Sequence, residues 1–533
     1  MTEIHLTGRA ASPGLAIGPV TMLTASVARR TASEDPAFEA AALRAAIEGA
    51  KAEIAEQIKT IQGEVADILE FQVAMLEDDA LADAAYEVIA AGIAADHAWR
   101  MALDVEIEGY RSAEDEYFRA RATDIVDIRD RVLAHLSGVD TVARIAGGSI
   151  VAADDITPST FLAADWSRGG AIALAAGSPS SHVAMLARSR GAPMVVGLGP
   201  LSWNGHPPAL ALVDGDAGTV IFDPEPETRR LFEQRMVDAN AAQAVAEAGS
   251  LAPAHTADGR RIAVLLNVTG PEDLAGLDPA ICDGIGLVRT EFLFEASHGL
   301  PDEDTQYDVY RRILEWAGGR PVTIRTLDAG GDKPIAGLTV DGESNPFLGL
   351  RGIRLSLARP EVFRVQLRAL ARAAVHGVLK VMLPMIAVPR ELDSAGVMLD
   401  AEVAALRAKG IACARPPLGI MIEVPAAALC AEDFDTAAFY SIGSNDLTQY
   451  TMAAARDIGA VADLNDAGHP AVLALIVRTV EAARKRAVEV SLCGDAAADT
   501  RLTTALLATG LRTLSVAPLT VARLKAAIAK VGS

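Results

Sequence analysis

The stretch LGIMIEVPAAALCAEDFDTAAFYSIGSND (418–446) holds two short apolar runs, LGIMIE (418–423) and FYSIGS (439–444), with a helical segment between them. Each run has the length of a buried strand. A polar residue stands at each end: Glu423 closes the first run, and Asn445 and Asp446 follow the second. A strand, a helix and another strand are typical of a parallel α/β unit, so the fold depends on how often this unit repeats.

The region 251–533 contains eight such runs, and helical segments separate most of them. Eight strand–helix repeats indicate a (β/α)8 barrel, whose active site lies at the C-terminal ends of its strands. Polar residues that could take part in catalysis or binding stand at those ends more often than a random scatter would place them. The eight runs are IAVLLN, GIGLVR, VTIRTL, LKVMLP, LGIMIE, FYSIGS, VEVSLC and TLSVA, and the polar residues are Asn267, Arg289, Arg325, Glu423, Asn445, Asp446 and Cys493.

The N-terminal half predicts a discontinuous domain. Residues 1–24 read as a strand and a turn, and β-like pieces return in 141–223 around one helix, so these two segments are expected to form one α/β domain. Between them, apolar residues at three- and four-residue steps (Ile47, Ile54, Ile58, Ile61, Val65, Ile68) predict a long helix within an inserted helical bundle, 25–140. The bundle is either a structural subdomain or a docking platform for a partner. Residues 224–250 read as a charged linker helix.

The net charge and the cysteine content limit the classes of partner and the cellular compartment that we expect for this protein. The formal net charge of −22 argues against nucleic acid or an anionic membrane, since both need a basic face, but it allows a small anionic substrate or a basic protein partner. The four cysteines lack metal or disulfide spacing, the N-terminus does not resemble a signal peptide, and no apolar run is long enough for membrane insertion. A cytoplasmic protein is the simplest expectation.

The charged residues of the barrel predict a cationic pocket in this acidic protein. Guanidinium groups suit phosphate and carboxylate, and two carboxylates with substrate oxygens are a usual way to hold Mg²⁺. A small molecule that carries both phosphate and carboxylate would fit, although each residue alone could instead serve in a surface salt bridge. The pocket residues are Arg289, Arg325, Lys333, Arg351 and Arg456 for the anion, and Glu423 and Asp446 for the metal.

His182 stands where a loop of small residues becomes a helix, in GSPSSHVAMLAR (177–188). A lone histidine is more often structural. At a helix N-terminus, however, backbone N–H groups favour a nearby anion, so this imidazole is suited to carrying a phosphoryl group.

These segments resemble the phosphoenolpyruvate-utilising enzymes. GSPSSHVAMLARSRGAPMVVG resembles their phosphohistidine segment. GIGLVRTEFLF, TIRTLDAGGDK, NPFLGLRGIR, GIMIEVPAAA and SIGSNDLTQYTMAAAR resemble their substrate-binding motifs. The order of segments, the inserted bundle and the opening ASPGLAIG are similar to the enzyme I family of the phosphotransferase system, almost from end to end.

The resemblance implies a phosphoenolpyruvate–protein phosphotransferase, with a role for each matched position. His182 matches the histidine phosphorylated on Nε2, and Cys493 the acid that protonates the enolate carbon. Glu423 and Asp446 match magnesium ligands. The bundle matches the docking surface for HPr, a small phosphocarrier, and the barrel a homodimer interface. Arg289, Arg325, Lys333, Arg351, Asn445 and Arg456 match phosphoenolpyruvate ligands.

The sequence departs from the family pattern before His182, where Ser178 and Ser180 replace a glycine and a threonine. Serine keeps the hydroxyl, so function is expected to survive. Two rival readings are a pyruvate phosphate dikinase or phosphoenolpyruvate synthase, which also need an ATP-grasp domain, and a sensor that binds phosphoenolpyruvate without turnover. Sugar uptake and a regulatory branch use similar first enzymes. The expected absence of an N-terminal sensor domain favours the sugar type.

Overall fold

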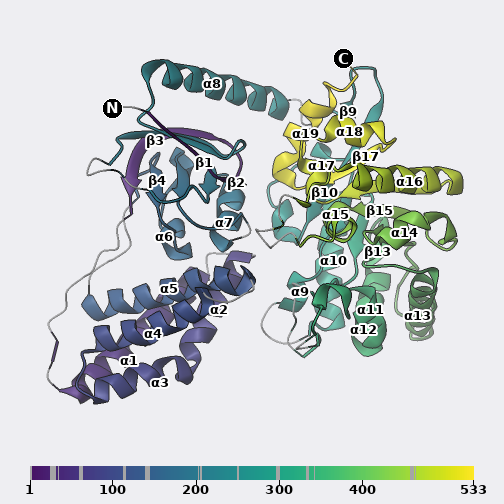
Figure 1. Cartoon of the computed structure of the whole chain (residues 1–533). Coiled ribbons are helices and arrows are strands. Elements are labelled where there is room, and N and C mark those ends of the chain that lie inside the picture. The colour runs from purple at the N-terminus through teal and green to yellow at the C-terminus, as the bar shows by residue number, and fades with distance from the viewer. Residues whose placement is uncertain are drawn as a thin grey trace. The chain divides into compact units, whose positions relative to one another are not determined.

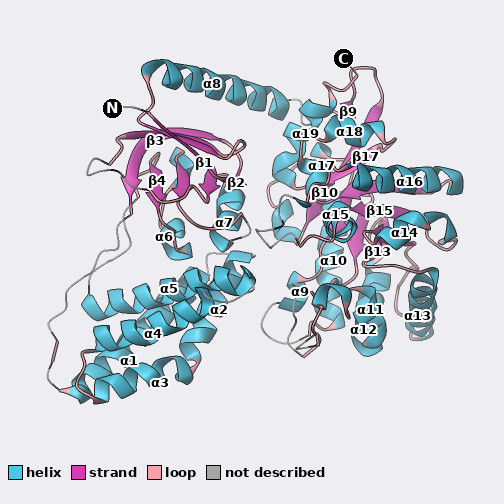
Figure 2. Cartoon of the chain, in the orientation of Figure 1, coloured by secondary structure: helices cyan, strands magenta, loops and turns pink. Residues whose placement is uncertain are grey.

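The computed structural model describes residues 3–23, 32–33, 35–58, 64–111, 116–138, 145–179, 181–201, 203, 207–248, 251–295, 300–331, 335, 337–340, 343–455, 461 and 464–532. The chain divides into two compact units, Met1–Asn240 with Asp457–Gly459, and Ala241–Arg456 with Ala460–Ser533. Figures 1 and 2 show helices and strands in both units.

The second unit is a closed barrel of eight parallel strands. Each strand pairs with the next, and the first, β10, pairs with both β11 and β17 and so closes the ring. A short strand, β9 (Ala254–His255), pairs antiparallel with the beginning of β10. The barrel strands are β10 (Arg261–Val268), β11 (Ile285–Val288), β12 (Val322–Arg325), β13 (Leu379–Leu383), β14 (Leu418–Ile422), β15 (Phe439–Gly443), β16 (Glu489–Cys493) and β17 (Thr513–Val516). They confirm the eight predicted runs.

Helices surround these strands, and the largest apolar core of the chain is formed by residues of the barrel unit. The barrel interior has its own small cluster, Leu287, Met382, Met421, Phe439 and Cys493. Because side chains alternate across a strand, one residue in two points inward. The α-helices are α9 (Phe292–Glu295), α10 (Glu303–Ala317), α11 (Ile353–Ala358), α12 (Pro360–Ala373), α13 (Pro389–Ala408), α14 (Pro425–Leu429), α15 (Ser444–Met452), α16 (Pro470–Arg486), α17 (Asp495–Ala498), α18 (Thr503–Ala508) and α19 (Val521–Ile528).

The first unit contains one eight-stranded mixed sheet, in the order β1-β8-β7-β3-β4-β5-β6-β2. Residues before and after the helical insertion share this sheet, because β3 pairs in parallel with β4 and antiparallel with β7. The N-terminal segment forms three strands, where the sequence suggested one strand and a turn. The strands are β1 (Ile4–Thr7), β2 (Arg9–Ser12), β3 (Leu15–Met22), β4 (Ile150–Ala153), β5 (Ala171–Leu174), β6 (Met194–Val196), β7 (Leu210–Asp214) and β8 (Thr219–Phe222).

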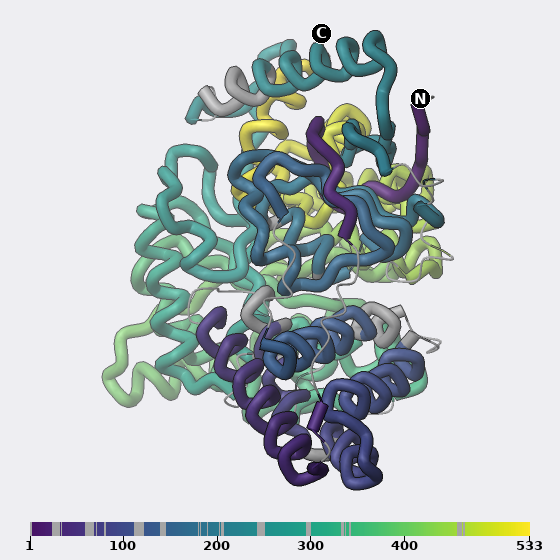
Figure 3. The backbone as a smooth tube through the Cα atoms, turned by 90° about the vertical axis from the view of Figure 1, so that its left-hand side faces the viewer, coloured from purple at the N-terminus to yellow at the C-terminus, as the bar shows by residue number. Residues whose placement is uncertain are grey.

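In the described part of the insertion, five helices share one apolar core that includes Trp99. They are α1 (Pro36–Ile58), α2 (Glu64–Glu77), α3 (Asp79–Ala90), α4 (Ala95–Arg111) and α5 (Glu116–Ser137), drawn from purple to blue in Figure 3. The predicted long helix corresponds to α1 and the start of α2, and Ile61 lies outside the described residues.

Two short helices connect strands of the mixed sheet along the chain: α6 (Pro158–Leu162) follows β4, and α7 (His182–Arg190) follows β5. Helix α8 (Pro226–Ala248) corresponds to the predicted linker helix. The barrel and the α/β unit with its helical insertion confirm the predicted fold class. Among the described residues, no helix combines the length and apolar character that a membrane crossing needs.

Candidate active site

An open cavity of about 90 Å³ lies at the C-terminal ends of the barrel strands. It collects side chains from five different strands or the loops that follow them, as the inward-facing end of a parallel barrel does. Gly443 leaves room there, since a Cβ on it would lie 2.9 Å from Glu423 Oε2. Six predicted site residues line the cavity together: Arg289, Arg325, Glu423, Asn445, Asp446 and Cys493.

Arg325, the last residue of β12, is a buried cation held by two buried acids. Its guanidinium lies 2.8 Å from Glu291 Oε2 and 3.1 Å from Asp328 Oδ2. Burial opposes the charge, but these carboxylates outweigh it and raise the pKa of Arg325. Its Nε is buried without a hydrogen-bond partner. The side chain is therefore fixed and charged before any ligand arrives.

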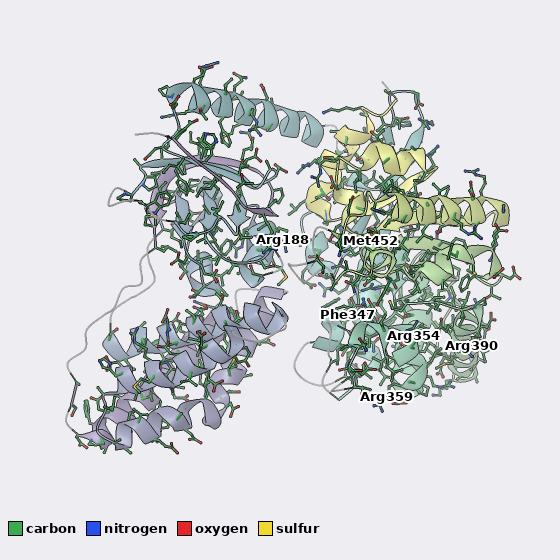
Figure 4. The ribbon with its side chains drawn as sticks, viewed as in Figure 1. Arg188, Phe347, Arg354, Arg359, Arg390 and Met452 are labelled. Carbon is green, nitrogen blue, oxygen red and sulfur yellow. The ribbon has the colours of Figure 1, made fainter. Side chains whose placement is uncertain are left out.

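Arg351 is fully buried and joins two acids from different parts of the barrel. Its guanidinium donates to Asp328, at 3.2 and 3.3 Å, and to Asp446, at 3.1 and 3.2 Å. The guanidinium also lies 5.8 Å from the ring centre of Phe347, which Figure 4 labels. Arg351 thus lies behind the cavity lining and holds Asp446 in place.

Glu423 and Asp446 bring two carboxylates to one cavity wall. Glu423 follows β14, is 1% exposed, and accepts a hydrogen bond from the Met385 N–H at 2.5 Å. Burial and the charges of Asp446 and Asp328 raise the pKa of Glu423. Asp446 pairs with Arg351, and burial opposes the charged form of Glu423, which a nearby divalent cation would favour. The described residues hold no group of three or more potential His, Cys, Asp or Glu ligands, so substrate and water oxygens would complete the metal's shell.

Asn445 and Cys493 also line the cavity. Asn445 donates to Asp495 Oδ2 at 3.0 Å and accepts from the Asp495 N–H at 2.9 Å, so its amide is oriented. Cys493 ends β16 and is 1% exposed. Burial raises the pKa of its thiol, although a hydrogen bond from Ser441 acts in the opposite direction. At neutral pH the sulfur therefore carries a proton.

His182 begins α7, as the sequence predicted. Ser181 caps this helix by accepting a hydrogen bond from the Ala184 N–H at 3.2 Å, and Gly191 ends it in the left-handed conformation. Arg188, labelled in Figure 4, donates to the carbonyls of Ala11 and Pro179 and so ties the helix to β2 and to the preceding loop. The cap thus holds the first turn of the helix, and Arg188 holds its last turn.

Several predicted positions fall outside the described residues: Lys333, Arg456, Ser180 and the side chain of His182. The sequence reasoning also missed residues that the structure brings into the site. Glu291 and Asp328 are buried partners of the arginines, and Tyr450 donates to the Phe347 carbonyl at 2.6 Å. The signal for the two acids was present, because each stands two or three residues after a strand-end arginine, in VRTE and IRTLD.

Family models for phosphoenolpyruvate-utilising enzymes match most of the chain. The model for the N-terminal part matches residues 7–121, the model for the mobile domain matches 145–218, and the model for the phosphoenolpyruvate-binding domain matches 243–533.

Similar proteins are named phosphoenolpyruvate-protein phosphotransferase. One from Bacillus sp. (strain S) is 37% identical over 96% of this chain and 91% of its own length. Another from Geobacillus stearothermophilus is 37% identical over 99% of this chain and 93% of its own. Among solved structures, an NMR solution structure of Enzyme I is 29% identical and covers 44% of this chain and 99% of its own, with a TM-score of 0.35.

Proposed function

The chain belongs to the phosphoenolpyruvate-utilising enzymes, and from this premise we propose that it transfers the phosphoryl group of phosphoenolpyruvate to His182 Nε2 and then to a histidine of HPr, releasing pyruvate. The observation that supports this most is the barrel cavity, where two arginines, two carboxylates and a buried thiol line one small volume. These groups match the phosphate, the metal and the leaving group of that reaction.

Catalysis of phosphoryl transfer relies on positioning and charge neutralisation rather than covalent chemistry by the protein. Arg289 and Arg325 would bind the phosphate and carboxylate groups, with Asn445 as a further phosphate contact and Lys333 and Arg456 completing the set. Arg351, which the resemblance also matches to a phosphoenolpyruvate ligand, is fully buried behind the lining and would act by positioning Asp446. Because Arg325 is already held by Glu291 and Asp328, little reorganisation is needed on binding.

Glu423 and Asp446 would hold Mg²⁺. When bound, the ion would neutralise charge on the phosphoryl and carboxylate oxygens. The two side chains are oriented for this role by Met385 N–H and by Arg351, respectively.

Cys493 would complete the first half-reaction. As the P–O bond of phosphoenolpyruvate breaks, His182 Nε2 takes the phosphoryl group and pyruvate enolate remains. The Cys493 S–H bond then breaks in favour of a C–H bond at the enolate carbon, giving pyruvate and a thiolate. This step needs a protonated thiol, which burial favours.

Each part of the chain would have its own role in the reaction. Residues 1–24 and 141–223 would carry the phosphohistidine, 25–140 would dock HPr, and 251–533 would bind phosphoenolpyruvate. His182 must visit both the barrel and HPr, so the linker 224–250 would act as the hinge of a swivel. We place the enzyme in the cytoplasm as a homodimer through its barrel, at the first step of sugar uptake or of its regulatory branch.

The test runs both half-reactions on variants. With labelled phosphoenolpyruvate and Mg²⁺, His182→Ala should take up no label, and wild-type label should be lost in acid and kept in base. Cys493→Ala should block pyruvate formation yet still accept phosphate from phosphorylated HPr. Label on another histidine would refute the assignment of His182, and near-normal pyruvate formation by Cys493→Ala would refute its acid role.

A further inference from the structure

Two serine hydroxyls lie beside Cys493 in the barrel interior. Ser441 on β15 and Ser491 on β16 are paired in register, and Cys493 follows Ser491 by two residues, so it faces the same side of its strand. Ser441 is 1% exposed. The proposed reaction gives these serines no role.

The hydrogen bonds among these side chains form one chain with a single direction. The Ser491 hydroxyl donates to Ser441 Oγ at 3.2 Å, and the Ser441 hydroxyl donates to Cys493 Sγ at 3.5 Å. The Cys493 thiol lies 3.5 Å from the Ile442 carbonyl, to which it donates. The Ser441 hydroxyl thus accepts a hydrogen bond from Ser491 and donates one to Cys493.

Exposure rises along β16 away from the cavity. Cys493 is buried, Ser491 is half-buried, and Glu489, nearest the N-terminal end of the strand, is exposed and pairs with Lys380 of β13. Successive inward-facing residues are separated by about 6.6 Å along a strand. The chain of hydroxyls therefore leads from the buried thiol toward the N-terminal end of the barrel, opposite the end where substrate would bind.

We propose that Ser491 and Ser441 form a hydroxyl relay that returns a proton to Cys493 after each turnover. The proposal rests on the acid role of Cys493 in the proposed function. That role consumes the thiol proton once per pyruvate, and it leaves a thiolate under a cavity that substrate and product occupy. A supply path along the barrel interior, from its N-terminal end, avoids this obstruction.

The proton balance of the relay is complete without another reactant. The thiolate takes the proton of Ser441, Ser441 takes the proton of Ser491, and Ser491 takes one from water. Each O–H bond that breaks is replaced by a new one on the same oxygen. The net change is that one solvent proton reaches the sulfur and, in the next turnover, the methyl group of pyruvate.

The relay predicts a difference between the first and later turnovers of the full-length enzyme. In Ser441→Ala the resident thiol proton still serves the first enolate, so a burst of about one pyruvate per active site should form at the wild-type rate. With excess HPr, the following steady-state rate should fall by at least about tenfold, within the range of a lost proton-transfer contribution. Because the slowed step follows the chemistry, kcat/KM for phosphoenolpyruvate should stay within about twofold, and KM should fall together with kcat.

Three further variants sharpen the test. Ser441→Thr keeps the hydroxyl and should recover most of the steady-state rate. Ser491→Ala should also show a burst with slow later turnover, and the double variant should be no slower than Ser441→Ala, because steps in series are not additive. Ser515→Ala is the matched control, since Ser515 is buried in the same barrel and donates to Asn267 Oδ1 on a neighbouring strand; it should keep normal kinetics.

Each outcome decides the proposal. A normal steady state in Ser441→Ala or Ser491→Ala overturns the relay, and an equally slow first turnover in Ser441→Ala overturns it in favour of thiol positioning alone. Cys493→Ala, measured in parallel, tests the acid role of Cys493 separately from the relay. If it keeps wild-type turnover, the acid role itself is wrong and the relay falls with it, whereas loss of its burst leaves the serine variants to decide.

Discussion

At the scale of single residues, each of the two buried arginines of the site has two carboxylate partners. Arg325 pairs with Glu291 and Asp328, and Arg351 pairs with Asp328 and Asp446. An unpaired charge at such depth would cost several kcal/mol. The pairing keeps the arginines charged and the carboxylates oriented, so the cavity is preorganised for an anion and a cation.

We predict that Glu423→Gln and Asp446→Asn each raise the Mg²⁺ concentration for half-maximal turnover by about tenfold or more. Each change removes one anionic oxygen ligand from a site that has only two among the described residues. Mg²⁺ titration of turnover, with Mn²⁺ binding followed directly, measures the effect.

Glu402→Gln is the matched control for these variants, because it also removes a buried negative charge that pairs with two arginines of the barrel unit but does not line the cavity. It should lower the unfolding temperature while leaving metal affinity within about twofold, since breaking a buried pair is strongly destabilising. Unchanged metal affinity in both Glu423→Gln and Asp446→Asn would rule out the metal site.

At the scale of elements, what matters is where each helix or strand begins and ends. The barrel strands end where their functional residues stand, and α7 begins at His182 because Ser181 caps it. The cap satisfies a backbone N–H that the first helical turn leaves free. A loss of this cap would let the first turn fray at the proposed phosphohistidine.

We predict that Ser181→Ala lowers the stability of the N-terminal unit by about 1 kcal/mol, the usual cost of a lost N-cap, and slows phosphate exchange with HPr. Ser181→Thr should keep both near wild type, because threonine also caps. Denaturant unfolding and the half-reaction with phosphorylated HPr give the two measurements. Asp302→Ala removes a similar cap from α10 of the barrel and should cost stability without slowing that exchange; equal exchange in Ser181→Ala and wild type would contradict the prediction.

At the scale of the whole molecule, the chain forms two compact units whose boundary, between Asn240 and Ala241, falls inside helix α8. The two units are therefore joined through a helix, and proline inside a helix interrupts it at a cost of about 3 kcal/mol. The proposed reaction makes different demands on this connection, because the phosphoenolpyruvate step uses both units and the HPr step uses only the first.

We predict that Ala241→Pro slows phosphorylation of His182 by phosphoenolpyruvate while phosphate exchange with HPr stays within about twofold. Ala241→Gly, which weakens the helix by only about 1 kcal/mol, should have a smaller effect. Rapid-quench measurements of the two half-reactions on one preparation compare them. A loss of both to the same degree would mean that the helix stabilises the first unit rather than links the two.

The sequence alone was sufficient for the barrel, because each buried strand is a short apolar run whose character depends on its own residues and not on distant partners. It also located the start of α7 and placed six site residues at strand ends. It was less successful with β1 and β2, since four-residue strands beside Gly8 and Gly14 carry too little periodicity to separate from a turn.

The tertiary structure alone decided which of these residues meet. Arg351 and Asp446 are 95 residues apart and share a bidentate ion pair, and Ser441 lies beside Cys493 only because β15 and β16 pair in this register. Local sequence sets whether a segment is a strand and which side chains alternate inward. Strand register and barrel closure set the neighbours, and these depend on packing across the whole chain.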